Sequence, residues 1–320
     1  MKINSRKTAV RIFKSNFALI LFASLSLCVF AQKRPAVSAQ TRTITIVSEP
    51  AASVWLDDIL RGKTDETGKL AIKNAPAGIH RLRIRANGFK ETTQTLTAAQ
   101  RGDIKITLAP TGDEAELAFQ QAEAQTDKQK AIELYHQAVG LRPKYAEAYV
   151  GLARALSATG EVEEALKAVA DARKARLNYA EASAVEGRIY NADGNEVKAI
   201  AAYKRAIREG KNFQPEAHTG LALLYRDKAE DAGSSGDLQT EKANLTLAAG
   251  ELSLAVKQLS GAPDAEILYQ ILGGIYEKMQ DYKKAIAVYQ EFLRIFPESN
   301  EASAVESFIV QLRKQMNGEQ

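Results

Sequence analysis

The fold is decided by three stretches that repeat one pattern: KAIELYHQAVGL at residues 130–141, EALKAVADARKA at 164–175 and KAIAAYKRAIRE at 198–209. Each stretch begins 34 residues after the one before it. The second position is always alanine (Ala131, Ala165, Ala199), and alanine returns seven residues later. A fixed period of this length indicates a stack of helix pairs, in which each pair buries its apolar face against its neighbours.

One complete unit shows why small residues recur. Residues 146–159 and 163–176 carry apolar side chains at helical spacing, with Gly160 at the break between them. Two helices that cross closely need small side chains at the contact and a large side chain beside it. The positions predicted to face inward are Tyr149, Leu152, Ala153, Leu156, Ala165, Leu166, Val169 and Ala172.

This pattern resembles the tetratricopeptide repeat family. Later units supply further matching positions, namely Gly187, Tyr190, Ala199, Tyr203 and Ala206, then Tyr269, Leu272, Gly273, Tyr276, Ala285 and Tyr289. The first unit is recognisable only in its second helix, residues 130–141. The resemblance implies an all-α helical-hairpin solenoid, a TPR-like superhelix of about four to five units over residues 113–299.

Residues 228–239 interrupt the period. The step from Ala199 to Ala285 is 86 residues, which is 18 more than two periods. The interrupting residues are rich in charge, glycine and serine, and a helical pattern resumes near residues 245–259. We interpret the insertion as a lengthened connection between the two helices of the fourth unit. Residues 300–320 are predicted to form a C-terminal cap helix and tail.

Residues 43–110 have a period of two instead. Apolar residues alternate with polar ones in short runs, such as Ile44 with Ile46 and Leu82 with Ile84, and glycine or proline separates the runs. This pattern predicts a small antiparallel β-sandwich, so the chain is a multidomain protein with an all-β part before an all-α part.

Two families share features with this stretch. Val47, Pro50, Ala52, Val54, Leu56, Asp57, Pro76, Gly78, Gly88 and Phe89 resemble the PEGA domain, whereas residues 64–70 also resemble the carboxypeptidase regulatory-like sandwich. The PEGA resemblance implies an envelope module of exported bacterial proteins.

Residues 1–31 are predicted to be a signal peptide. Five basic residues and no acidic residue precede an apolar run at 17–31, which is shorter than the ~20 residues that span a bilayer. Small residues Val29 and Ala31 favour cleavage after Ala31, and an uncleaved anchor is the alternative. Residues 32–42 are a predicted linker. The expected location is therefore the periplasm or the cell envelope.

Charge and motif content exclude several classes of function. Beyond residue 31 the chain has 38 basic and 39 acidic residues, so there is no case for nucleic-acid binding. The only cysteine, Cys28, lies in the predicted signal peptide. His80, His136 and His218 stand in separate elements without metal-ligand spacing, and no nucleophile or phosphate-loop motif occurs. We therefore expect no catalytic residues, no metal, no cofactor and no membrane span in the mature chain.

The first helix of each unit lines the concave surface in tetratricopeptide arrays. Carrying that register across gives Glu147, Val150, Arg154, Ser157, Glu181, Ala184, Arg188, Asn191, Glu216, Thr219, Leu223 and Arg226. Arg154 and Arg188 are one period apart, with Asn191 and Arg226 beside them. Such a ladder suits an acidic or extended peptide held by bidentate contacts. The alternative is that these are ordinary surface arginines paired with Glu147 or Glu181.

The sandwich has a candidate surface of its own. Arg81, Arg83 and Arg85 alternate with apolar residues, so all three leave one sheet face, where they could meet an envelope polymer. The alternative is a solvated strand face that discourages edge pairing. Trp55 also points outward, either as a stacking platform or packed at the junction with the repeats.

Together these features predict an exported non-enzymatic scaffold whose groove binds a protein or peptide partner in the cell envelope. The alternative function is an envelope-anchoring module that binds cell-wall or anionic polymer through the sandwich. A hydrolase is the third possibility, and no residue pattern displays its mechanism.

Overall fold

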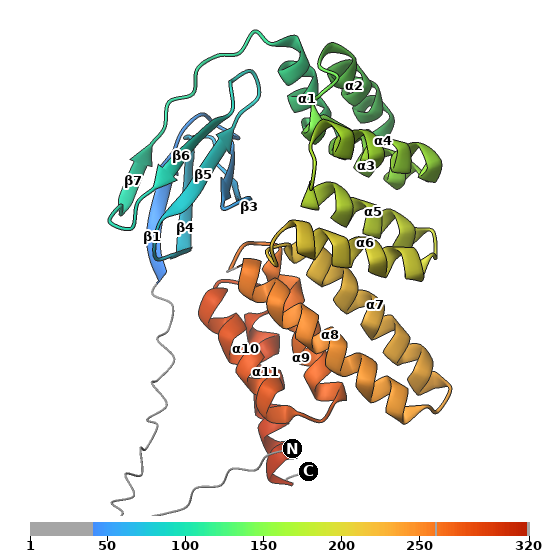
Figure 1. Ribbon diagram of the computed structural model, residues 1–320. Helices are drawn as coiled ribbons and strands as arrows, with labels where there is room; N and C mark the ends of the chain where they lie inside the picture. Colours follow the sequence, from blue (N-terminus) through green and yellow to red (C-terminus); the bar gives the residue numbers. More distant parts are fainter. Residues whose placement is uncertain (1–40, 260, 319–320) are drawn as a thin grey trace, which may run out of the picture. The chain divides into compact units, whose positions relative to one another are not determined.

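The computed structural model describes residues 41–259 and 261–318, in which a β-sandwich is followed by a helical array (Figure 1). The predicted signal peptide with its cleavage site and Cys28 lies outside the described residues, as does the predicted linker up to residue 40. Within the described residues, no helix combines the length and the apolar character that crossing a membrane requires.

Seven strands form the sandwich. They are β1 (Thr41–Val47), β2 (Ser53–Leu56), β3 (Ile59–Lys63), β4 (Lys69–Pro76), β5 (His80–Arg85), β6 (Thr92–Leu96) and β7 (Gly102–Lys105). One sheet has the order β4-β1-β7 and the other β3-β2-β5-β6. The alternating apolar residues meet between the sheets, where Ile44, Ile46, Val54 and Leu82 are fully buried. Each sheet is apolar on one face, and the two apolar faces pack together to form the core.

One strand pair differs from the predicted antiparallel arrangement. β1 and β7 run parallel, from Ile44 opposite Gly102 to Val47 opposite Lys105. Parallel neighbours need a crossover rather than a hairpin, and the segment from β2 to β6 provides it. Alternation of side chains is the same in both kinds of pair, so the sequence pattern does not reveal the direction of β7.

Eleven helices follow within residues 111–259 and 261–318 (Figure 1). They are α1 (Glu114–Ala124), α2 (Lys128–Leu141), α3 (Ala146–Thr159), α4 (Val162–Ala175), α5 (Ala180–Ala192), α6 (Glu196–Glu209), α7 (Pro215–Ser234), α8 (Leu238–Leu259), α9 (Ala265–Lys278), α10 (Tyr282–Ile295) and α11 (Ala302–Asn317). Consecutive helices pack as pairs from α1/α2 to α9/α10, and α11 packs on α10 at the position predicted for the cap helix. The helical part is the predicted hairpin solenoid.

The recurring small residues lie where the helices of a pair touch. Ala131, Ala165, Ala199 and Ala285 are at most 2% exposed. Within a pair, Gly187 faces the ring of Tyr203 and Gly273 faces the ring of Tyr289; between neighbouring pairs, Gly151 faces Tyr135 and Gly220 faces Tyr203. A Cβ atom at any of these glycines would lie within 2.5 Å of the ring, so the ring needs the space that glycine leaves. The packing rule expected from the sequence is confirmed.

The insertion at residues 228–239 does not form a long connection, contrary to our interpretation. α7 continues to Ser234 and α8 begins at Leu238, so the extra residues lengthen both helices. Ala229, Ala232, Leu245 and Ala248 are buried between them, which makes continued helix favourable despite the charged composition. Gly236, with φ of 80°, forms the short turn.

The first helix of the first pair, α1, was not recognised in the sequence. Its buried residues Ala115, Ala118 and Ala122 have helical spacing, and the Asp113 carboxylate caps it by accepting from the Glu116 amide at 3.1 Å. The Asp113-x-x-Glu116 pattern before an apolar stripe is a helix start signal that could have located α1.

Candidate functional site

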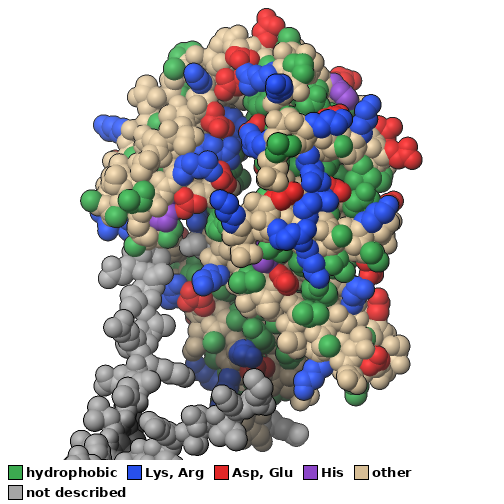
Figure 2. Space-filling model, viewed as in Figure 1, with side chains coloured by type: hydrophobic (Ala, Val, Ile, Leu, Met, Phe, Trp, Pro, Cys, Tyr) green, Lys and Arg blue, Asp and Glu red, His purple; other side chains and the backbone are tan. Residues whose placement is uncertain are grey.

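A cavity of about 1110 Å³ lies between the sandwich and the helical array. Its helical wall comes mainly from α3, α5 and α7, the first helices of three successive pairs, and its other wall from the β3-β2-β5-β6 sheet. Equivalent positions line up there because each pair stacks on the next with the same register. Basic and acidic side chains are interspersed over the face of the molecule shown in Figure 2.

Eight of the twelve residues predicted to line the concave surface of the array also line this cavity. They are Glu147, Arg154, Glu181, Arg188, Asn191, Glu216, Thr219 and Leu223. Val150 and Ala184 do not, because their side chains turn into the packed interior and are 2% and 0% exposed. Ser157 is also outside the lining.

Arg226 does not line the cavity either, which corrects its place in the expected ladder. It contacts the neighbouring Asp227 at 2.9 Å. α7 begins at Pro215. A helix rises about 1.5 Å per residue, so Arg226 is ~16 Å along the axis, beyond the first turns that carry Glu216, Thr219 and Leu223.

Arg154 is held by a carboxylate two repeats away. Its Nη1 and Nη2 donate to the two oxygens of Glu216 at 2.9 and 2.6 Å, and Nη2 also reaches Glu181 at 3.4 Å. Burial disfavours the charged guanidinium, but the charges and hydrogen bonds of Glu216 and Glu181 outweigh it and raise the pKa of Arg154. This bidentate pair fixes α3 against α7 across the groove.

Arg188 shares the same carboxylate. Its Nη1 lies 3.6 Å from Glu216 Oε1, the oxygen that already accepts from Arg154. Burial, and then the charge of Arg154, lower the pKa of Arg188. The two arginines therefore form no free cationic ladder, and an acidic peptide would have to compete with Glu216. Glu147, the alternative partner considered from the sequence, is bound by Arg176 instead.

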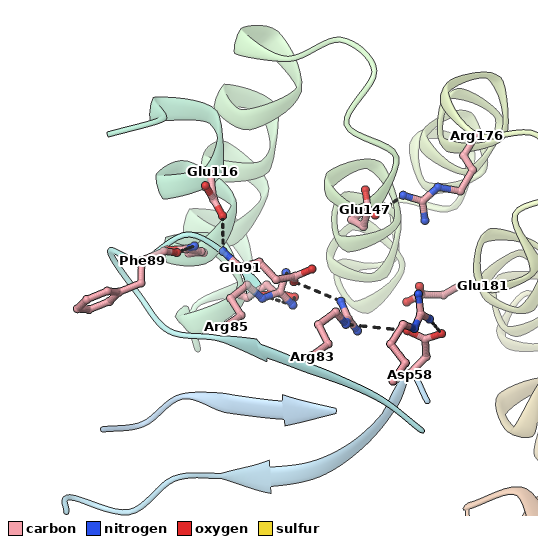
Figure 3. A network of polar contacts seen from close by, with 12 residues as sticks. Asp58, Arg83, Arg85, Phe89, Glu91, Glu116, Glu147, Arg176 and Glu181 are labelled. Carbon is pink, nitrogen blue, oxygen red and sulfur yellow. Dashed lines mark hydrogen bonds and ion pairs between the residues drawn. The ribbon is translucent and has the colours of Figure 1, made fainter. Parts of the chain in front are cut away.

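The sandwich wall also pairs its arginines with acids. Arg81 contacts Asp58. Arg83 lies between Glu91 at 3.3 Å and Asp58 at 3.9 Å (Figure 3). The guanidinium of Arg83 stacks 4.3 Å from the centroid of the Trp55 ring. The arginines of the sheet face that could have bound an anionic polymer are thus paired with acids of the same chain.

Arg85 joins the sandwich to α1 rather than facing solvent. Its guanidinium lies between the Trp55 and Phe119 rings, at 4.8 and 4.7 Å from their centroids, and contacts Glu123 at 3.0 Å. Burial raises the pKa of Glu123, and the charge of Arg85 opposes that rise. Trp55 therefore lies at the junction with the repeats. The sequence reasoning missed Phe119 and Glu123, because the helix that carries them was not recognised.

The lining has nearly balanced charge and mixed polarity. Five arginines and six carboxylates face the cavity together with apolar side chains such as Leu60, Leu223 and Leu268. In the part of the chain that the structure describes, no cluster of His, Cys, Asp or Glu residues could hold a metal ion. The arrangement is suited to binding a segment by packing and hydrogen bonding rather than by bulk charge.

Tyr203 should make the array sensitive to alkali. It is 3% exposed, and burial followed by the charge of Glu216 raises its pKa to about 12. An unfolded tyrosine ionises near pH 10, so the folded state holds the proton more tightly. The stability this contributes is complete below pH 10 and is lost between pH 10 and 12. Between pH 10 and 12, we expect the free energy of unfolding of Tyr203→Phe to fall by about 2 kcal/mol less than that of wild type. Urea unfolding of both proteins between pH 8 and 12 measures it, and parallel pH curves would contradict the assignment.

Comparisons with known proteins match two stretches of the helical array to one family. Residues 122–189 and residues 267–299 each match a family model described as tetratricopeptide repeat. Protein O-mannosyl-transferase TMTC1 from Homo sapiens is 25% identical over 171 residues, which are 53% of this chain and 18% of TMTC1. The chain therefore spans less than a fifth of the length of this curated relative.

Solved structures of other proteins are similar to this chain at low sequence identity. The thermophilic TPR protein TTC0263 of Thermus thermophilus is 19% identical with a TM-score of 0.41, over 61% of this chain and 99% of that chain. The human IFIT1 dimer with m7Gppp-AAAA is 18% identical with a TM-score of 0.47, over 64% and 46% of the two chains. The two family-model matches and the paired helices together support tetratricopeptide repeats at residues 122–189 and 267–299, and the helical array that contains them is a TPR-like solenoid.

Proposed function

We propose that this protein is an exported, non-enzymatic scaffold whose groove binds a protein or peptide partner in the cell envelope. The observation that carries the proposal is the convergence of eight first-helix positions from three repeats on one cavity of about 1110 Å³. Side chains on a rigid helical frame present a surface that is already organised before a partner arrives, which lowers the cost of binding.

The partner segment should be uncharged or carry both signs. Glu216 and Glu181 already contact Arg154, and Glu216 also lies 3.6 Å from Arg188, so a strongly acidic peptide would have to compete with these carboxylates. Asn191, Thr219 and Leu223 supply hydrogen-bonding and apolar contacts at the same wall. We place the site of binding on these three residues.

Export and an envelope location rest on the predicted signal peptide and on the PEGA resemblance of the sandwich. The polymer-binding alternative has less support, because Arg81, Arg83 and Arg85 each contact a carboxylate of this chain. We therefore assign the binding role to the groove.

Blocking the groove with bulky cations tests the proposal. The full chain carrying Asn191→Arg and Thr219→Arg is immobilised, exposed to envelope extract of the source cells, and compared with wild type by quantitative mass spectrometry. The control is Gln137→Arg with Ala201→Arg, which adds the same charge at exposed positions of α2 and α6. A candidate partner is then purified, and its Kd is measured.

We expect the Kd of the groove variant to rise at least about tenfold, because two large side chains would occupy the contact surface. The control should bind as wild type does. If wild type and the groove variant bind the partner with equal affinity, the cavity is not the binding site.

A further inference from the structure

The sandwich contacts the array at two places that differ in strength. One lies at α1, next to the start of the helical array, and the other at the C-terminal repeats, around α8 and the connection between α10 and α11. Both contacts border the cavity region, so the way they hold the sandwich decides access to the groove.

The contact with α1 is made of buried and backbone-directed hydrogen bonds. Gln120, only 4% exposed, donates from Nε2 to the Phe89 carbonyl at 2.7 Å and accepts from the Gly88 amide at 2.9 Å. Glu116 accepts from the Glu91 amide at 3.1 Å, as Figure 3 shows. The Arg85 guanidinium, held between two aromatic rings, adds an ion pair with Glu123. Backbone groups fixed from both sides leave this junction little freedom.

The contact with the C-terminal repeats is smaller. Ile59, the first residue of β3, is 7% exposed and joins the hydrophobic cluster of α8, α9 and α10. Asn74 Nδ2 donates to the Ile295 carbonyl at 3.0 Å. Lys73 contacts Glu298 at 2.7 Å, but both side chains are more than half exposed, so the pair adds little.

A second cavity shows that this smaller contact is loosely packed. It measures about 390 Å³ and lies between the β2–β3 turn and α8, lined by Asp57, Ile59, Phe213, Leu254 and Gln258 among others. Ile59 lines this open pocket, so part of its side chain lacks the protein contacts that a side chain in a packed core makes. Domain interfaces of this kind open more readily than a packed core.

We propose that the sandwich is a lid over the groove, hinged at α1 and latched by Ile59 and Asn74. Release of the latch swings the β3-β2-β5-β6 sheet away from α3, α5 and α7, so that a chain segment reaches Asn191, Thr219 and Leu223. With the latch closed, the sheet forms the second wall around that segment. The lid rests on the proposed function for its purpose, but its motion is measurable without any partner.

Trp55 is a built-in reporter of the lid. It is the only tryptophan of the chain, and it lies in the sandwich wall of the cavity. Acrylamide, a small neutral quencher, reaches an indole in proportion to its exposure, so the quenching constant of Trp55 follows the open population.

A disulfide can hold the latch shut. A Cβ atom at Gly261 would lie 3.5 Å from the Asn74 Cβ, within the range that a disulfide spans, and 2.9 Å from Cγ2 of Ile295, whose side chain must shift slightly to admit it. The locked protein is therefore the full chain with Asn74→Cys and Gly261→Cys, with Cys28→Ser to remove the one native thiol. The released protein is Ile59→Ala with Asn74→Ala, and it tests the lid independently of the strain at Gly261, where φ is 74°.

Acrylamide quenching of Trp55 is compared in wild type, the released protein, and the locked protein with and without dithiothreitol. We expect release to raise the open population about tenfold, and the quenching constant at least about twofold, because the latch has few other contacts. Oxidised locked protein should quench less than wild type, and dithiothreitol should reverse this. Equal quenching in wild type and the released protein, or no response of the locked protein to dithiothreitol, overturns the lid.

The outcome separates the lid from the proposed function. If quenching follows the latch but the groove variant still binds its partner with wild-type affinity, the lid stands and the groove assignment fails. If the groove variant loses its partner but quenching ignores the latch, the groove assignment stands and the lid fails.

Discussion

Replacing Ala199 with leucine is expected to lower the free energy of unfolding by about 3 kcal/mol, the upper end of what overpacking a core costs. Ala199 is fully buried and lies in a cluster with Ala184 and Tyr203, where α5 and α6 pack together. Three additional carbon atoms have no free volume there, so the two helices must separate or Tyr203 must leave its position.

Ala201 provides the matched control for this substitution. It lies two residues further along α6 but is exposed, so Ala201→Leu should change the free energy of unfolding by less than about 0.5 kcal/mol. Urea unfolding followed by far-ultraviolet circular dichroism measures both variants. Similar unfolding of the two leucine variants would mean that the contact between α5 and α6 differs from the one described.

Gly273→Ala is expected to destabilise the last repeat by about 1 to 2 kcal/mol, although alanine is the better helix former. The new Cβ would lie 2.2 Å from Cε1 of Tyr289. That ring cannot move freely, because it is 4% exposed and its hydroxyl donates to Glu277 at 2.5 Å. The steric cost therefore exceeds the gain in helix propensity.

The neighbouring glycine should respond in the opposite direction. A Cβ at Gly274 meets no atom within 4 Å among the described residues, so Gly274→Ala should raise the free energy of unfolding by about 0.5 to 1 kcal/mol. Thermal unfolding of the two variants in parallel tests the contrast. A stabilising Gly273→Ala would show that Tyr289 does not fill the space beside the helix.

The proposed lid changes how these repeats work as a scaffold. The groove of an isolated solenoid is open along its length, whereas here the sheet carrying Trp55 and Arg83 faces α3, α5 and α7 across the cavity. Binding would then depend on the latch at Ile59 as well as on the groove residues. Affinity for a partner segment would be reduced by the fraction of molecules that are closed.

The sequence predicted the parts of the fold that depend on contacts between neighbours in the chain. Alanine at a spacing of 34 residues located α2 to α6, because each pair is stabilised mainly by its own two helices and the next pair. The same reasoning failed at residues 228–239, where charged residues on the exposed faces hid the continuous helices α7 and α8. It also failed at α1, whose partner surface includes the β5–β6 connection, a contact that no repeat pattern records.

The candidate site divides in the same way. Register alone placed Arg154, Arg188 and Asn191 on one wall, since a helical repeat determines which positions share a face. It did not reveal that Glu216 would bind Arg154 and lie close to Arg188, because the contact with Arg154 spans 62 residues and depends on how the helix pairs stack. Arg85 and Trp55 were expected on an outward sheet face, and the position of Phe119 decided that this face is partly covered.

By itself, the sequence determined that the chain forms a sandwich followed by paired helices, because the spacing of small and large side chains encodes local packing. Tertiary structure alone decided which charges remain available and where the sandwich touches the array. The physical reason is that an ion pair or a domain contact depends on distances between residues far apart in the chain, and these distances follow from how every intervening helix is stacked.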